Sequence, residues 1–492
     1  MAAETYAFNF FNEDLSTADA SNSHDRKTLW ISSAYPRNAV SNRLRENPFN
    51  YPPVELGFSD LPSTGEVEGK LLVGSIIELN RWLLKNPKAL AKIQSAFGHG
   101  EIDLLSGGPP CQSFSMAGLR QKDSDKNSLP WEFASFAKQV KPKLILLENV
   151  SGILRPFKDA TGQKYHAWFE ISKAFVEVDY IPLCMHVNAK FVGVPQNRPR
   201  FILLGIRSDL IQKILKNSNF SEHELLKSSS LFYEKVKSKI DVSLEDLRCW
   251  DLANSKNQDL IKTTFLKYLI SHAEHLSVHE AIGDLFPSST FQSKFKENLA
   301  SVFCKVIKSK KLSNHEYRSN SSLVQRRFRI YQVLNELSSS SKVELTHVLN
   351  GRSSDISPET WREVSRFKFL VETSKLSSFK TKTDLINFIV QHKTKKRTQK
   401  ALIAHQPAPA ALSIPDDACH YHVEQLRTLS VREMARIQSF PDDFEFRSKI
   451  TTGGKMRRYE VPQYTQVGNA VPPLLGRALG LSIKELLKRV GK

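Results

Sequence analysis

Residues 107–118 read GGPPCQSFSMAG and follow the short apolar run IDLLS. An apolar run that meets glycines and two prolines is typical of a strand that ends in a rigid loop. The loop carries one cysteine, Cys111, directly after Pro109 and Pro110. A loop at a strand end can expose a thiolate, which is the nucleophilic form of cysteine. An unreactive free cysteine behind a proline turn fits the same residues, so Cys111 alone does not identify a site.

A second apolar run, LILLENVSG at residues 144–152, ends in an acid and an amide. Glu148 and Asn149 stand at the carboxyl end of the strand that this run predicts. A carboxylate in that position often caps a helix or pairs with a base, and it can also act as a general acid.

Three polar side chains precede a third apolar strand in GVPQNRPRFILLGIR, residues 193–207. Gln196, Arg198 and Arg200 occupy every second position, and alternate residues of an extended chain share a face. Two guanidinium groups can therefore point to one place, although arginine pairs in basic proteins are often solvated or contact phosphates. With Cys111 and Glu148, they lie at strand ends of what we predict to be one parallel sheet, where ligands of such sheets bind.

These blocks resemble the bacterial DNA cytosine C5-methyltransferases. The resemblance rests on the Pro-Cys-Gln loop, the Glu-Asn-Val strand end and the Gln-x-Arg-x-Arg segment, in that order. It continues with RTLSVREMARIQSFPDDFEF at residues 427–446 and QVGNAVPPLLGRALG at residues 466–480, and it covers roughly residues 100–207 and 426–481. It implies an α/β fold, with a Rossmann-like, S-adenosylmethionine-dependent methyltransferase sheet and a large inserted target-recognition domain.

The resemblance implies a reaction that needs these residue types. Addition of the Cys111 thiolate to carbon 6 of cytosine turns the ring into an enamine whose carbon 5 can attack a methyl donor. Glu148 would protonate or hydrogen-bond ring nitrogen 3, Arg200 would hold the ring carbonyl and Arg198 would support the catalytic loop. The donor would be S-adenosylmethionine, and the target base would be flipped out of duplex DNA.

The family's blocks assign two further groups of residues by position. Support of the catalytic loop is expected from Pro110, Gln112, Asn149 and Gln196. Contacts with the methyl donor are expected from Pro109, Leu129, Asn469 and Val471.

The composition agrees with a DNA-binding protein of the reducing cytoplasm. Lys and Arg number 70 against 51 Asp and Glu, a net charge of +19 that suits a polyanion, although a membrane surface would attract it too. No apolar run approaches the ~18 residues needed to cross a bilayer, and we find no secretory signal pattern. The five cysteines are scattered without a C-x-x-C pair, so we expect neither a zinc site nor a disulfide framework.

A chain of 492 residues favours two domains. We expect a catalytic and cofactor domain from residues 1–207 plus 426–492, and a target-recognition domain from residues 208–425. Helices are predicted at residues 131–140, at 323–337 and after Ser357-Pro358. The basic runs 308–311 and 393–400 could track phosphates, and residues 407–410 read as a linker back to the first domain.

The return to the first domain begins with a predicted capping box, in which Ser430 precedes Glu433 by three residues. Leu429 and Met434 are placed to form a hydrophobic staple, and Phe440-Pro441-Asp442 is expected to end the helix. Residues 466–471 are predicted to form a glycine turn before a last helix at residues 474–488.

The chain departs from the family pattern near its beginning. Family members open with a strand and a Phe-x-Gly-x-Gly loop, and the aligned residues 8–17, FNFFNEDLST, contain no glycine but two carboxylates that would face the donor. Ser33 stands where the family has the acid that holds the donor ribose, and Ser75 follows Gly74 where the family has an aspartate. We therefore expect weak binding of the donor.

Several functions remain open. The first is a DNA cytosine C5-methyltransferase that acts as a monomer on double-stranded DNA, with a cognate restriction endonuclease as a possible partner. The second is a degenerate methyltransferase that binds DNA without modifying it, or one half of a split enzyme completed by another subunit. A transfer-RNA enzyme is disfavoured because its Cys-Phe-Thr segment is absent, and no nuclease cluster of the Pro-Asp…Glu-x-Lys kind is found.

Overall fold

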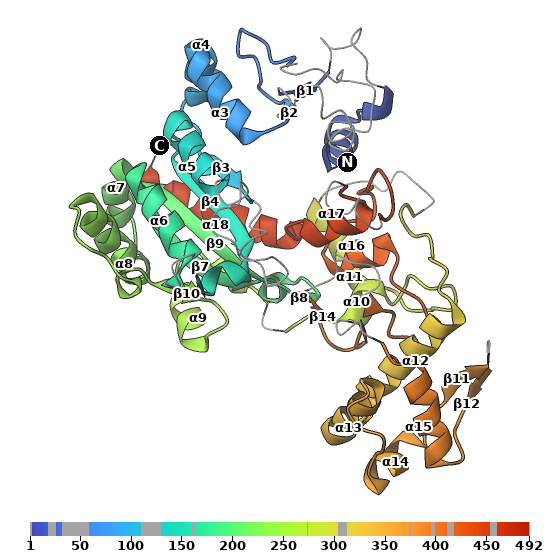
Figure 1. The fold of residues 1–492 in the computed structure, drawn as a ribbon. Helices are drawn as coiled ribbons and strands as arrows, with labels where there is room; N and C mark the ends of the chain where they lie inside the picture. The colour runs from blue at the N-terminus through green and yellow to red at the C-terminus, as the bar shows by residue number, and fades with distance from the viewer. Residues whose placement is uncertain are drawn as a thin grey trace.

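The computed structural model describes residues 2–17, 26–31, 59–109, 129–158, 164–272, 274–303, 312–372, 375–394, 399–410, 418–452 and 460–491. Its centre is a mixed sheet of five strands in the order β10-β7-β9-β4-β3 (Figure 1). The strands are β3 (Leu104–Gly107), β4 (Leu144–Val150), β7 (Tyr180–Asn188), β9 (Pro199–Arg207) and β10 (Cys249–Asp251). The three apolar runs that adjoin the chemical motifs are thus strands of one sheet.

The expectation of a purely parallel sheet is wrong. β3 is parallel to β4, and β10 is parallel to β7, but β9 is antiparallel to both β4 and β7. Only residues 189–198 connect β7 to β9, whereas a parallel crossover needs a dozen or more residues. The reversal brings the start of β9 beside the carboxyl end of β4, with Arg200 opposite Val150.

Helices cover both faces of this sheet, which confirms the α/β class and the Rossmann-like sheet. On one face, α5 (Leu129–Val140) and α6 (Ala167–Glu177) bury Phe133, Ala137 and Phe175 against the strands. On the other face, α18 (Pro473–Val490) packs with α7 (Ile211–Lys216) and the short helix η10 (Lys267–Ile270). α5 and α18 agree with the helices predicted at residues 131–140 and 474–488.

The segment after residue 207, where we expect the target-recognition domain to begin, continues to pack on the central sheet. It contains η8 (Ser208–Leu210), α7, α8 (Phe220–Lys237), η9 (Leu244–Asp246), β10, α9 (Ser255–Ile261) and η10. β10 extends the central sheet, and Trp250, Ile261 and Leu269 are buried in the same core as β7 and β9.

The N-terminal part is built differently from the expected strand and loop. Residues 8–11 and 15–17 lie in the helical turns η1 (Ala7–Phe11) and η2 (Leu15–Thr17), which follow α1 (Ala2–Tyr6), and residues 12–14 connect the two turns. Asn9 fixes this helix, since its amide donates to the carbonyl oxygens of Thr5 and Glu445, at 2.7 Å each. The Glu13 carboxylate is held by the Lys27 N–H and the Thr28 hydroxyl, so it does not point freely at a ligand.

Two short parallel strands, β1 (Thr28–Trp30) and β2 (Leu71–Val73), form a separate sheet followed by α3 (Ile76–Lys85), α4 (Pro87–Gln94) and η4 (Ala96–Gly98). Ser75 caps α3 by accepting from the Ile77 N–H. Ser33, the residue expected near the donor ribose, lies outside the described residues.

A second core joins the helices α10 (Val278–Ile282), α11 (Lys294–Phe303), α16 (Val431–Ile437) and α17 (Gln463–Asn469). The predicted capping box is confirmed at Ser430 and Glu433, and the side chains of Leu429 and Met434 are both buried. The helix ends at Ile437, before the expected proline, because Ser439 adopts a left-handed conformation. Residues 466–469 are the last turn of α17, not the predicted glycine turn.

A third core is a helical lobe (Figure 1) made by α12 (Ser322–Glu336), α13 (Ser339–Leu349), α14 (Pro358–Val364) and α15 (Lys382–Gln391), with the hairpin β11 (Phe369–Glu372) and β12 (Lys375–Ser377). The helices predicted at residues 323–337 and after Ser357 are confirmed.

The remaining strands are short pairs. They are β5 (Phe157–Lys158) with β6 (Lys164–Tyr165), β13 (Lys400–Ala401) with β15 (Ala418–Cys419), and β14 (Ala408–Pro409) with β8 (Gln196–Asn197). The stretch expected to be a free linker at residues 407–410 is therefore strand-paired to the Gln-x-Arg-x-Arg segment. No described helix has the length and apolar character that a membrane crossing requires.

Candidate active site

Glu148 and Arg200 form the centre of the site. The Nε atom of Arg200 lies 2.7 Å from Oε1 of Glu148. Glu148 pairs across the ladder with Ile202, so Arg200 is its diagonal neighbour on the same face of the sheet. Their side chains retain 17% and 10% exposure, so the ion pair is mostly buried but can be reached from outside.

Burial controls the protonation of both groups. It raises the pKa of Glu148, and the positive charges of Arg200 and Arg198 oppose this only in part. Burial also lowers the pKa of Arg200, while Glu148 acts in the other direction. The site therefore combines a carboxyl group that takes up a proton more readily than usual with an adjacent guanidinium donor.

Arg198 is held by the C-terminal part of the chain. Its Nη2 atom donates to the carbonyl oxygens of Gly468 at 2.6 Å and Ala470 at 2.9 Å. The side chain is almost fully buried, which with the nearby charge of Arg200 lowers its pKa to about 9, so Arg198 remains charged at neutral pH. It fixes residues 468–470 against the start of β9.

Gln196 points to the same side as Arg198, as the alternation predicts. Its Nε2 atom donates to the carbonyl oxygen of Pro409 at 3.2 Å. The Oε1 atom of Gln196 and the Nε atom of Arg198 are buried without a hydrogen-bond partner among the described residues. A buried polar atom without a partner is unfavourable, so these two atoms mark a place where a further contact would stabilise the site.

The start of the proline-cysteine loop reaches this ion pair. The Nδ2 atom of Asn149 donates to the carbonyl oxygen of Pro109 at 3.0 Å. A Cβ atom added to Gly108 would lie 3.3 Å from Oε2 of Glu148, so the backbone passes close to the carboxylate. Pro110, Cys111 and Gln112 lie outside the described residues.

The residues expected to contact the methyl donor are distributed over three segments. Pro109 lies two residues after β3, Leu129 begins α5, and Asn469 and Val471 flank Ala470 at the junction of α17 and α18. Asn469 and Val471 are exposed, and Arg198 holds the carbonyls on either side of Asn469. An accessible amide beside an accessible apolar side chain fits, in chemical type, the polar and apolar parts of S-adenosylmethionine.

The backbone acceptors at Pro409, Gly468 and Ala470, and the close approach of Gly108, are the parts of the site that sequence reasoning missed. Every residue has a backbone carbonyl, so the amino-acid sequence does not show which carbonyls accept hydrogen bonds in the site. Only the Gly107-Gly108 pair indicated a place where the backbone could pass close to another group.

The sequence is similar to those of known proteins. Residues 85–485 match the family model of C-5 cytosine-specific DNA methylase. The type II methyltransferase M.Bpa9945I of Bacillus paralicheniformis is 27% identical over 78% of this chain and 71% of its own length. The type II methyltransferase M1.HphI of Haemophilus parahaemolyticus is 27% identical over 79% of this chain and 70% of its own.

Similarity to solved structures is low. The Dnmt2 methyltransferase of S. pombe aligns with 94% of this chain and 99% of its own, with 11% identity and a TM-score of 0.36.

Proposed function

We propose, from the premise that the chain belongs to the C-5 cytosine-specific DNA methylase family, that it transfers a methyl group from S-adenosylmethionine to carbon 5 of a cytosine in duplex DNA. One observation carries the proposal. The Glu148–Arg200 pair adjoins Gly108 and Pro109, the residues that lead into the Pro-Cys-Gln loop.

Cys111 is the proposed nucleophile. It follows Pro109 by two residues, and two residues of extended chain span about 7 Å. Pro109 is tied by its carbonyl oxygen to Asn149, the neighbour of Glu148. Chain connectivity therefore supports a sulfur close to the ion pair, where its thiolate would form a bond to carbon 6 of the cytosine ring.

Glu148 and Arg200 are proposed to bind the edge of the same ring. Sulfur addition places negative charge on ring nitrogen 3, and a carboxyl group with a raised pKa can give a proton there. Arg200 would donate to the ring carbonyl. Carbon 5 would then take the methyl group of the donor, which would leave as S-adenosylhomocysteine. Loss of the carbon 5 proton to a base would restore the ring double bond and expel the Cys111 thiolate, and ring nitrogen 3 would give up the proton it had gained.

S-adenosylmethionine would supply an electrophilic methyl group, held on the side of Pro109, Leu129, Asn469 and Val471. Arg198 would position Asn469 and Val471 through the two flanking carbonyls. The ring can meet these groups only outside the base stack, so the cytosine must be flipped out at a cost of a few kcal/mol.

The partners follow from the family and from the charge. Duplex DNA suits a net charge of +19. Relatives that are named type II methyltransferases lead us to propose a cognate restriction endonuclease as a partner. The helical lobe α12–α15 is the part that we propose selects the DNA sequence.

A split enzyme is the second candidate, and one observation favours it. Within the described residues, β3 pairs only with β4, and its leucines are partly exposed, whereas the interior of β9 is fully buried. A complementing chain could add a strand at that edge. Purified protein that binds DNA but methylates only after addition of a second subunit would favour this candidate.

The direct test is Cys111→Ser. We expect loss of labelled methyl transfer to duplex DNA, with DNA binding retained, because a hydroxyl is a much weaker nucleophile than a thiolate. The matched control is Cys249→Ser, since burial raises the pKa of the Cys249 thiol to about 12 and leaves it unreactive. Methyl transfer by Cys111→Ser at the wild-type rate would remove Cys111 from the mechanism.

A further inference from the structure

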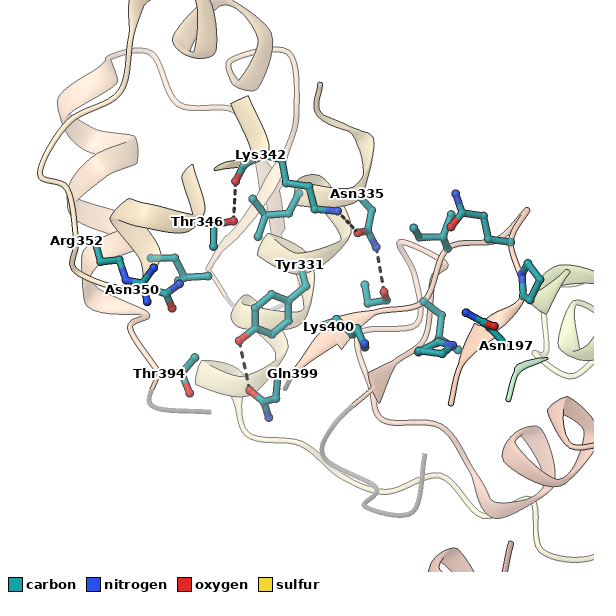
Figure 2. A pocket seen from close by; sticks show the side chains of 18 residues that line it. Asn197, Tyr331, Asn335, Lys342, Thr346, Asn350, Arg352, Thr394, Gln399 and Lys400 are labelled. Carbon is teal, nitrogen blue, oxygen red and sulfur yellow. Dashed lines mark hydrogen bonds between the residues drawn. The ribbon is translucent and has the colours of Figure 1, made fainter. Parts of the chain in front are cut away.

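A groove lies between the helical lobe and the segment that carries Arg198 (Figure 2). Its volume is about 870 Å³. One wall is formed by α12, α13 and the turn after α13, and the other by residues 399–409 together with Asn197 of β8. Asn197 stands between Gln196 and Arg198, so the groove begins one residue from the candidate active site.

The groove has a cationic lining. Lys342, Arg352 and Lys400 contribute positive charge, and none of the described residues that line it is Asp or Glu. Arg352 and Lys400 are exposed, and neither side chain forms a hydrogen bond or ion pair with another described residue. In a chain with 51 acidic residues, a cationic groove without acids favours an anionic occupant.

The rest of the polar lining is already ordered by hydrogen bonds (Figure 2). Nζ of Lys342 donates to Oδ1 of Asn335 at 3.0 Å, and Nδ2 of Asn335 donates to the carbonyl oxygen of Ala401, also at 3.0 Å. These bonds fix the Lys342 ammonium group on the wall opposite Lys400. The occupant would therefore meet one charge held in place, that of Lys342, and two unpaired charges, those of Arg352 and Lys400.

We propose that this groove binds the phosphate backbone of one DNA strand beside the target cytosine. Arg352 and Lys400 would contact phosphates directly, and Lys342 would add a third, fixed charge. This inference rests on the proposed function, which supplies duplex DNA as the substrate. It assigns the DNA contact to named residues of the helical lobe and of the facing segment 399–409, which the family's sequence blocks do not cover.

The position of the groove supports a strand that also reaches the active site. Residues 399–409 form its floor, and the same segment ends on the Pro409 and Ala410 carbonyls that accept from Gln196 and Arg198. This wall of the groove is thus joined by hydrogen bonds to the two side chains that precede Arg200 at alternate positions.

The test is the double variant Arg352→Ala/Lys400→Ala, measured for binding to duplex DNA over a range of salt concentrations. We expect affinity to fall about tenfold or more, and the slope of log affinity against log salt to decrease by about 2, because each lost phosphate contact lowers that slope by about 0.9. The rate of methyl transfer at saturating DNA should change little.

The matched control is Arg366→Ala/Lys380→Ala, which removes two exposed positive charges from the same lobe but not from the groove. Equal affinity and equal salt slope in the two double variants would overturn the groove assignment. Wild-type protein that binds no DNA would instead refute the proposed function and this inference together. DNA binding without methylation would refute only the catalytic part and leave the groove test valid.

Discussion

Two buried glutamate–arginine pairs in this molecule have the same shortest distance between nitrogen and oxygen, but the pKa values of their two carboxyl groups are shifted in opposite directions. In the candidate active site, Glu148 and Arg200 are 2.7 Å apart, and the pKa of Glu148 is raised. Beside α16, Glu433 and Arg427 are also 2.7 Å apart, and the pKa of Glu433 is lowered. Distance alone therefore does not decide whether a buried carboxylate stays ionised.

The number of donors explains the difference. Burial opposes ionisation of Glu433, but both terminal nitrogens of Arg427 and the Ser430 N–H donate to its carboxylate and together outweigh that penalty. Arg200 is the one ion-pair partner of Glu148 among the described residues. The Glu433 side chain also has no solvent-exposed surface, while the Glu148 side chain is 17% exposed. The Glu433–Arg427 pair is satisfied and closed to solvent, whereas the Glu148–Arg200 pair is under-satisfied and open, as the proposed general acid must be.

The largest effect is expected from Glu148→Gln. Removal of a general acid typically costs 10²–10⁴-fold in rate, and we expect a loss of about that size in the single-turnover rate of methyl transfer. The pKa of Glu148 is raised, so the acid form is present below that pKa and is lost as the pH rises through it. The decrease in wild-type rate on the alkaline side should be absent in the variant. An unchanged rate and pH profile would remove Glu148 from the reaction.

Arg427→Met tests the other pair. It leaves Glu433 buried without its arginine, and breaking a buried pair in this way costs about 3–5 kcal/mol in the free energy of unfolding. The folded pKa of Glu433 is lowered, so the pair stabilises the fold above the unfolded carboxyl pKa and loses this effect as the pH falls. Urea unfolding should therefore show a smaller difference between variant and wild type in acid than at neutral pH.

The control for this substitution is Arg366→Met, on an exposed arginine. If Arg427→Met unfolds at the same urea concentration as that control, the Glu433–Arg427 pair is not a structural element, and the contrast with Glu148 is lost.

The smallest effect is expected from Ser430→Ala. The Ser430 hydroxyl accepts from the Glu433 N–H at 3.1 Å, and loss of such a cap costs about 1 kcal/mol. Ser339→Ala, in the first turn of α13 but not a cap, should cost less. Thermal unfolding of the two variants measures the difference. Equal midpoints would show that the hydroxyl adds nothing to the environment of Glu433.

The positions of Glu148 and Arg200 could be predicted from the sequence because both residues stand at the ends of predicted strands. Glu148 and Arg200 stand at the ends of apolar runs, and those runs became neighbouring strands of one sheet. The antiparallel direction of β9 was missed because periodicity reports the faces of a strand but not its direction. The capping box at Ser430 was found because its chemistry is local.

Long-range contacts account for the errors. Residues 8–17 form helical turns, fixed by bonds between Asn9 and the distant Glu445 that no local pattern reveals. Residues 407–410 were read as a linker because prolines are common in linkers, yet Ala408 and Pro409 pair with β8. The groove was missed because Arg352 and Lys400 lie far from Asn197 in the chain.

The most direct test of the central claim is covalent trapping on duplex DNA that contains 5-fluorocytosine, in the presence of S-adenosylmethionine. Fluorine blocks the last elimination, so wild-type protein should form a protein–DNA adduct that survives denaturing electrophoresis. Glu148→Gln should form it more slowly, and Cys111→Ser should form none. An adduct of Cys111→Ser that forms at the wild-type rate would contradict the account.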